Sequence, residues 1–159
     1  MKTIIKNKQA FSDNDNLILL CNKESNLSAF SISKDELNYI QKEGKEGKEI
    51  ITINQYSRLV FIVNPKFEKE ANKHLEDVRL LGDQLQVNLK DEESVMIIDV
   101  KGNQTEVLAI AEGMALANYT FTSHKTDPKP NKLRTLYLCK KASENDTEEL
   151  QNLVDAVYL

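Results

Sequence analysis

The side chains best suited to metal chemistry lie at spacings of four and three residues within one predicted helix. Glu70, His74 and Asp77 would share a face of that helix, an arrangement that brings potential metal ligands together. The apolar stripe of the same helix is expected to face the core, so the three polar residues lie on or beside its solvated side. Surface helices carry such trios through charge pairing, and no second cluster completes a coordination shell. We therefore interpret the trio as surface charge and assign no metal ligand.

A glycine- and lysine-containing segment, Gly44 to Lys48, has a superficial likeness to a phosphate-binding loop. Such a loop needs more residues between its glycines, a Ser or Thr after the lysine, a strand before it and a helix after it. Here Glu49 follows the lysine, a predicted helix precedes the segment and a predicted strand follows it. The segment is therefore predicted to be a flexible connection.

A locally basic region lies between residues 124 and 141. It contains His124, Lys125, Lys129, Lys132, Arg134, Lys140 and Lys141, opposed only by Asp127. Cationic side chains bind nucleic acid by releasing counterions, but only Phe121 and Tyr137 lie nearby to stack on bases. A solvated loop and strand edge is the favoured interpretation, because lysines commonly protect sheet edges. A nucleic-acid accessory surface is kept as an alternative.

No recognised enzyme motif accompanies these clusters. The chain has no Gly-x-Ser-x-Gly elbow and no dinucleotide-binding fingerprint. Sequence spacing alone does not pair its carboxylates into an acid and a base. We therefore predict no catalytic, cofactor-binding or metal-binding residue in this chain, and expect any enzymatic role to come from a partner domain.

The composition is that of one globular domain. The chain has 159 residues, 40% hydrophobic and 29% charged, with a net charge of −4 that gives no general attraction to nucleic acid or anionic membrane. No apolar run approaches the roughly 18 residues of a membrane span, and the start lacks the features of a signal peptide. Cys21 and Cys139 each end an apolar run and are interpreted as buried thiols, with a disulfide as the alternative. A cytoplasmic location is expected.

Hydrophobic patterning predicts an α/β fold. In the first half we expect a strand at 16–21 and a weaker strand at 27–32. A helix follows, which begins at the capping box of Ser33 and Glu36 and ends at Gly44. Strands 50–53 and 59–63 are expected to form an antiparallel hairpin. Pro65 is predicted to lie in the first turn of the next helix, whose apolar stripe is Ala71, Leu75, Val78, Leu85 and Leu89. The second half is predicted to contain a strand at 94–98, a turn at Gly102-Asn103, a helix at 105–119, a strand at 133–138 and a helix at 147–159. Asp146 and Glu149 form a capping pair for the last helix. Alternating strands and helices favour a mixed, largely parallel sheet with helices on both faces.

The last predicted helix has an apolar stripe of Leu150, Leu153, Val154 and Val157 but no capping residue at its end. This pattern suggests a helix that continues. We therefore expect residues 1–159 to form a single N-terminal domain, with residues 147–159 leading into a C-terminal domain.

One predicted helix is rich in small residues: Ala109, Ala111, Gly113, Ala115 and Ala117. A glycine inside a helix costs about 1 kcal/mol relative to alanine, and close backbone packing is the usual compensation. The alternative is that alanine is simply the best helix former.

This helix also carries a family resemblance. Ala111-Glu112-Gly113, followed by Tyr119-x-Phe121 and Lys125, resembles the N-terminal domain of the leucyl aminopeptidase family of dinuclear-zinc exopeptidases. Three other segments fit. The 44–48 loop leads into a hairpin whose second strand is 58–63, and the strand at 133–138 follows a basic loop. Residues 153–159 are similar to the helix through which such proteins enter their catalytic domain. The resemblance covers residues 44 to 159. One departure is Asn64-Pro65, where the family commonly has a glycine-containing turn.

The resemblance implies a macro-domain-like, non-catalytic domain of a cytosolic hexameric hydrolase that releases N-terminal residues, often leucine, from peptides. Two divalent metals, zinc or manganese, would activate a bridging water in the C-terminal catalytic domain, which also binds the peptide. The family's metal site includes Asp-Ala-Glu-Gly-Arg, but here Ile110 and Met114 stand in place of the aspartate and the arginine, so no zinc ligand is transferred to Glu112. The rival interpretation is a free-standing macro-like module that binds a nucleotide such as ADP-ribose at the carboxyl ends of its strands, although none of its five glycines cluster after a predicted strand.

Overall fold

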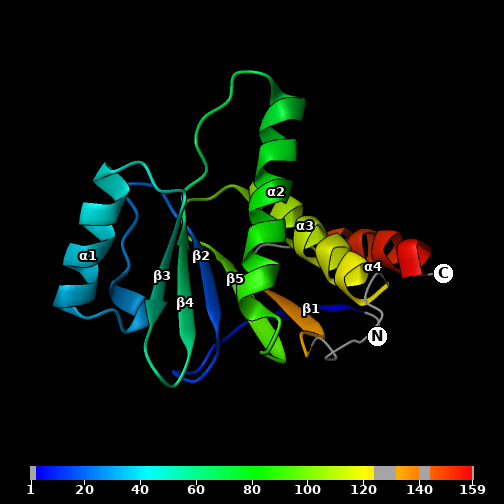
Figure 1. Cartoon of the computed structure of the whole chain (residues 1–159), viewed down its shortest axis with the longest axis horizontal. Coiled ribbons are helices and arrows are strands. Elements are labelled where there is room, and N and C mark those ends of the chain that lie inside the picture. The colour runs from blue at the N-terminus through cyan, green and yellow to red at the C-terminus, as the bar shows by residue number, and fades with distance from the viewer. Residues whose placement is uncertain (1–2, 124–131, 140–143, 159) are drawn as a thin grey trace.

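A six-stranded, largely parallel sheet forms the centre of the molecule. The computed structural model describes residues 3–123, 132–139 and 144–158. The strands are β1 (Ile4–Lys8), β2 (Leu17–Leu20), β3 (Ile50–Asn54), β4 (Leu59–Val63), β5 (Ser94–Asp99) and β6 (Thr135–Cys139), in the order β1-β6-β5-β2-β4-β3. Each neighbouring pair is parallel except the β3–β4 hairpin. The predicted mixed, largely parallel α/β sheet is confirmed (Figure 1).

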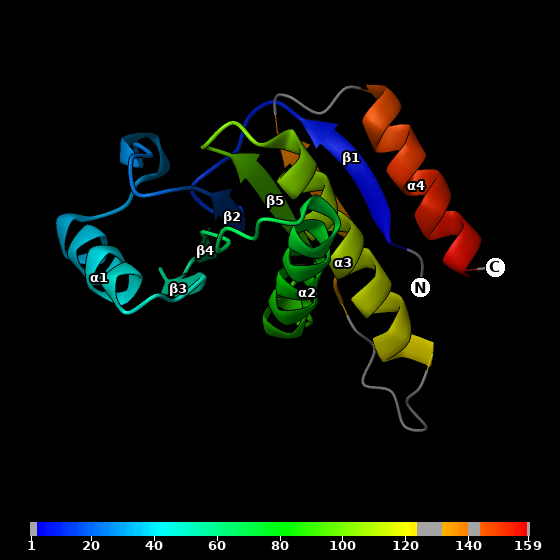
Figure 2. The ribbon, with the colours of Figure 1, turned by 90° about the horizontal axis from the view of Figure 1, so that it is seen from above.

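Helices cover both faces of this sheet. They are α1 (Lys34–Lys45), α2 (Ala71–Leu89), α3 (Gln104–Ser123) and α4 (Glu144–Tyr158), with a short 3-10 helix, η1 (Ser28–Phe30), before α1. Alternate strand residues enter opposite cores. On β4, Phe61 and Val63 share a core with α2, α3 and α4, while Val60 and Ile62 share one with η1 and α1. Figure 2 shows α1 and α4 at opposite ends of the molecule, with α2 and α3 between them.

The two longest helices, α2 and α3, cross at glycines. A Cβ added to Gly113 of α3 would overlap the backbone carbonyl of Arg79 on α2. One added to Gly82 of α2 would overlap the carbonyl oxygen of Ile110 and lie 3.2 Å from the Cα of Gly113. The prediction that Gly113 marks close backbone packing is confirmed, and its partner is the glycine of a second helix.

Helix α4 covers the outer side of the edge strand β1. The Nε2 of Gln151 donates to the carbonyl oxygen of Thr3 at 3.0 Å, and its Oε1 accepts from the backbone N–H of Ile5 at 2.6 Å. A side-chain amide thus satisfies backbone groups that an open sheet edge would expose. Leu150 and Val154 are buried in the same core as Ile5, whereas Leu153 is 43% exposed. Part of the apolar stripe predicted to meet a second domain is therefore covered within this one; the Val157 side chain lies outside the described residues.

The predicted strand at 27–32 is wrong. The Oδ1 of Asn26 accepts from the backbone N–H of Ser28 at 2.9 Å, η1 follows, and Ser31 adopts a positive φ of 54°. Phe30 is buried against α1 and the sheet. The apolar pattern of this segment therefore comes from a turn packed on the core and does not indicate a strand.

The start of α1 is confirmed, and its end is not where it was predicted. The Oγ of Ser33 accepts from the backbone N–H of Glu36 at 3.1 Å, and the Glu36 carboxylate accepts from the Ser33 backbone at 2.9 Å. Gly44 lies inside α1, which runs to Lys45, and the left-handed residue after it is Gly47, with φ of 82°. The connection predicted at 44–48 is thus displaced by two residues.

Two other helix boundaries also differ from prediction. Helix α2 begins at Ala71, so Pro65 lies in the preceding loop. Glu49 holds that loop extended, because its carbonyl oxygen accepts from the N–H of Asn64 at 2.8 Å and its carboxylate from that of Lys66 at 2.9 Å. Helix α4 begins at residue 144, which places residue 146 within it rather than at its N-cap.

Both cysteines are buried thiols, as predicted, and they form no disulfide. Burial raises the pKa of the Cys21 thiol to about 12, which keeps it neutral. Within the described ranges, no helix is both long and apolar enough to cross a bilayer.

Candidate functional site

At the carboxyl ends of the neighbouring strands β2 and β5, the chain leaves the sheet toward opposite faces. These strands are neighbours, and the chain leaves β2 toward α1 on one face of the sheet and β5 toward α3 on the other. The backbone N–H groups of Val100 and Lys101 donate to the carbonyl oxygen of Leu20 at 2.9 and 3.1 Å, which joins the two strand ends. Open α/β sheets bind ligands at such a point. The side chains at this edge therefore form the candidate site.

A tight turn connects β5 to α3. One carboxylate oxygen of Asp99 accepts from the backbone N–H groups of Gly102 and Asn103 at 2.7 and 2.9 Å. The Oδ1 of Asn103 in turn accepts from the N–H of Glu106 at 3.1 Å, which caps the helix. Gly102 has a φ of 87°, a conformation that side-chain-bearing residues rarely adopt. The predicted turn at Gly102-Asn103 is confirmed, and it places the Glu106 side chain next to α2.

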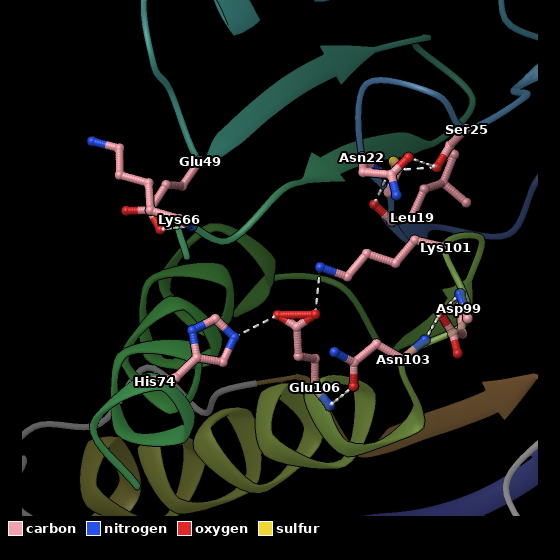
Figure 3. A network of polar contacts seen from close by, with 12 residues as sticks. Leu19, Asn22, Ser25, Glu49, Lys66, His74, Asp99, Lys101, Asn103 and Glu106 are labelled. Atoms are coloured by element: carbon pink, nitrogen blue, oxygen red, sulfur yellow. Dashed lines mark hydrogen bonds and ion pairs between the residues drawn. The ribbon is translucent and has the colours of Figure 1, made fainter. Parts of the chain in front are cut away.

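Glu106 is the central group of the site. It is 1% exposed, and its carboxylate lies between His74 of α2 and Lys101 of the β5–α3 connection (Figure 3). The Nε2 of His74 is 3.0 Å from one oxygen, and the Lys101 ammonium pairs with the other. A buried carboxylate needs such partners, because losing its hydration costs several kcal/mol. The hydrogen bond to His74 connects α3 to α2, and the ion pair with Lys101 connects α3 to the end of β5.

The metal trio considered from the sequence does not assemble. Glu70 is the N-cap residue of α2, Asp77 is exposed, and His74 turns to Glu106 on α3. Among residues 3–123, 132–139 and 144–158, no three His, Cys, Asp or Glu side chains are grouped so that they could hold a metal ion. The sequence placed His74 on or beside a solvated surface, but its side chain is only 19% exposed. Helical spacing could not identify Glu106, which lies 32 residues away.

Buried polar atoms without a partner are concentrated at this edge. Six buried side-chain N or O atoms of the described residues accept or donate no hydrogen bond. Two of them, on Glu43 and Glu106, are each in an ion pair with a lysine. The other four are His74 Nδ1, Asp99 Oδ2 and both amide atoms of Gln104. Most buried polar groups in native proteins are satisfied, so this edge of the sheet is chemically different from the rest of the described core.

A cavity of about 490 Å³ adjoins these groups. His74, Lys101 and Asn103 lie along it, with Phe67, which is 88% exposed, at its rim. The Lys101 ammonium and the Asn103 amide can donate hydrogen bonds, the carboxylates of Glu68 and Glu106 also line the cavity, and the Phe67 ring offers a flat apolar surface. The cavity has the size of a small-molecule site.

The basic region predicted from the sequence is only partly described. Lys132 and Arg134 are exposed, and their backbone N–H groups donate to Lys90 and Glu93 at 2.8 and 2.9 Å. The other cationic residues of the region (His124, Lys125, Lys129, Lys140 and Lys141) and Asp127 lie outside the described residues. The nucleic-acid alternative therefore stays a prediction.

The remaining candidate residues have structural partners. Lys48, in the segment compared with a phosphate loop, pairs with the carboxylate of Glu43, and this pairing raises the pKa of the lysine. Glu112, to which no zinc-ligand role was transferred, accepts from Nε of Arg79 at 3.1 Å. That bond raises the pKa of the Arg79 guanidinium. Both pairs connect neighbouring parts of the fold.

The chain is an open α/β domain, and its candidate site lies at the carboxyl ends of β2 and β5. No family model matches the chain, and no curated protein matches it. Among solved structures, a mutant of tomato leucine aminopeptidase matches with a TM-score of 0.62 and 11% sequence identity. The alignment covers 97% of this chain and 36% of that one. At this identity the likeness establishes a shared fold, over about a third of the aminopeptidase chain.

Proposed function

We propose that this chain is the non-catalytic N-terminal domain of a metallo-aminopeptidase of the leucyl aminopeptidase type. One observation carries the proposal: nearly the whole chain, 97% of it, aligns with a 36% portion of a leucine aminopeptidase. The resemblance of residues 44–159 to the N-terminal domain of that family points the same way. The role of the domain is assembly and packing on a catalytic domain.

In this proposal the chemistry belongs to the catalytic domain. Two divalent metals, zinc or manganese, would be held there together with the peptide, and this chain contributes no ligand. The described residues offer no group of three candidate ligands, and the one buried carboxylate of the candidate site, Glu106, is already paired with Lys101 and His74. Assembly into a homo-hexamer and a cytosolic location are part of the same proposal.

The outer face of α2 offers apolar side chains for packing against the catalytic domain. Leu80 and Val87 are 51% and 59% exposed and lie two helical turns apart. Both residues belong to α2, whose backbone packs directly on the backbone of α3 at Gly82, so this surface has a closely packed helix behind it. An interface with the catalytic domain would cover both side chains.

The proposal is tested by comparing this chain with the native protein that contains it. Hydrolysis of leucine amides, with zinc or manganese added, is expected from the native protein and not from the 159-residue chain. Metal-dependent turnover by the chain alone would contradict a non-catalytic role. A native protein without aminopeptidase activity would contradict the assignment to this class.

A second candidate function is supported by the unpartnered polar atoms at the strand ends. A macro-like module would bind a nucleotide such as ADP-ribose in the cavity beside His74, Lys101 and Asn103. Calorimetric titration with ADP-ribose separates the two candidates. Binding that is lost in Lys101→Met would favour the module, and no heat of binding would dismiss it.

A further inference from the structure

A second cavity, of about 530 Å³, lies on the opposite face of the sheet, beneath α1. Its boundaries are α1, the loop after β2, and strands β3 and β4. Its inner wall is formed by aliphatic side chains and a thiol: Cys21, Leu27, Leu37, Ile40, Ile51 and Ile62. Because burial raises the pKa of Cys21 to about 12, its thiol is neutral and belongs to the apolar wall. Such a concave, mostly apolar space is typical of small-molecule sites.

The charges around this cavity have one sign. The described residues that line it include Lys23, Lys45 and Lys48 and no aspartate or glutamate. The chain as a whole has 25 acidic and 21 basic residues, so this asymmetry is opposite to the overall balance. Lys48 pairs with Glu43, whereas in the described part of the chain no ion pair involves Lys23 or Lys45. The mouth of the cavity therefore suits an anionic group.

Gly44 borders open space at this cavity. It lies within α1 and lines the cavity, and a Cβ added to it would meet nothing within 4 Å. Gly82 and Gly113 are required by the helix crossing, but no neighbouring group requires a glycine at position 44. Glycine inside a helix reduces stability relative to alanine. Position 44 therefore borders open space, and a larger side chain introduced there can test access to the cavity.

We infer that this cavity binds an aliphatic carboxylate, of the size and chemistry of a medium-chain fatty acid. The hydrocarbon chain lies along the aliphatic wall, and the carboxylate lies at the mouth near Lys23 and Lys45. None of the described residues that line the cavity has an aromatic ring, so its walls match a hydrocarbon chain better than a nucleobase. This inference does not depend on the proposed aminopeptidase or on the site at Glu106.

Calorimetric titration of the 159-residue chain with decanoate tests the inference. One molecule is expected to bind per chain, with a Kd on the order of 0.1 mM or tighter. Decanol and decylamine, which share the hydrocarbon chain without the negative charge, are expected to bind at least about tenfold more weakly. Absence of saturable decanoate binding, or equal affinity for the three probes, would overturn the inference.

Two sets of variants locate the binding. Gly44→Leu adds a bulky side chain at a position where the Cβ meets nothing within 4 Å and is expected to weaken decanoate binding at least about tenfold, whereas Gly44→Ala retains most of the affinity. The double variant Lys23→Glu/Lys45→Glu is also expected to lose about tenfold. Its matched control, Lys34→Glu/Lys42→Glu, makes the same charge change on exposed residues of the same helix that do not line the cavity. Unchanged binding in Gly44→Leu, or equal losses in the two lysine pairs, would contradict a site beneath α1.

Discussion

Gly82 and Gly113 lie against each other where α2 and α3 cross, and neither position has space for a Cβ atom. A side chain on either residue would strike the backbone of the opposite helix rather than a flexible side chain. The helices therefore have to move apart to accommodate even a methyl group. Because α2 also covers the sheet, such a shift would disturb the core beneath it.

Alanine at either glycine is expected to destabilise the fold by about 2–4 kcal/mol, since overpacking and a backbone shift combine. Urea unfolding of Gly82→Ala and Gly113→Ala measures the effect. Gly44→Ala is the matched control, because it changes a helical glycine that faces open space. The control is expected to gain about 0.5–1 kcal/mol from helix propensity. The same sign of change in all three variants would refute the close crossing.

The buried ion pair of Glu106 and Lys101 gives a second prediction. Glu106→Gln leaves the ammonium of Lys101, 16% exposed, without its carboxylate partner and is expected to cost about 3–5 kcal/mol. Adding Lys101→Met should recover part of this loss, with a coupling of about 1–3 kcal/mol in a double-mutant cycle. The control is Glu112→Gln, whose carboxylate is 24% exposed and pairs with Arg79; it is expected to cost no more than about 1 kcal/mol. Additive effects of Glu106→Gln and Lys101→Met would show that the pair does not stabilise the fold.

The capping box of α1 links stability to pH. Hydrogen bonding from the Ser33 backbone holds the pKa of the Glu36 carboxyl below its ordinary value. Folding therefore favours the ionised form, and this contribution is present at neutral pH and lost as the pH falls through the lowered folded pKa. Glu36→Gln is expected to reduce the free energy of unfolding near pH 7 by about 0.5–1 kcal/mol and to flatten its decline below pH 5. Parallel pH profiles for the wild type and the variant would argue against this linkage.

Most elements of the fold could be predicted from the sequence, because their periodicity reflects which face they bury. The stripe of α2 and the short apolar strands β2, β4 and β5 are examples. Strand β1 could not be recognised, because it is an edge strand with Ile5 as its one buried residue. Its partner β6 lies about 130 residues further along the chain, a pairing that no local pattern reveals.

The candidate site could not be predicted from the sequence, for a related reason. His74 was noticed because of its neighbours on the same helix, but its actual partner, Glu106, is brought to it by the crossing of α2 and α3. Gly113 predicted that such a crossing exists without indicating which helix it contacts. Contacts between elements distant in sequence depend on packing geometry, and helical or strand periodicity does not encode that geometry.

The proposed interface on α2 predicts a difference between the isolated domain and the native protein. Leu80→Asp and Val87→Asp replace exposed side chains, so the stability of the chain alone is expected to change by less than about 0.5 kcal/mol. In the native protein the same changes would bury an unpaired charge against the catalytic domain and disrupt assembly. Analytical ultracentrifugation of both forms measures this, with Gln84→Asp, an exposed change on the same helix, as control. Intact assembly in both variants would exclude this surface as the interface.

The most direct measurement is the intact mass of the native protein, isolated with an antibody raised against this chain, together with its activity on leucine amides. Our account predicts a polypeptide well above 18.1 kDa whose aminopeptidase activity is lost with a chelator and restored by zinc or manganese. A native polypeptide of 18.1 kDa without that activity would contradict it.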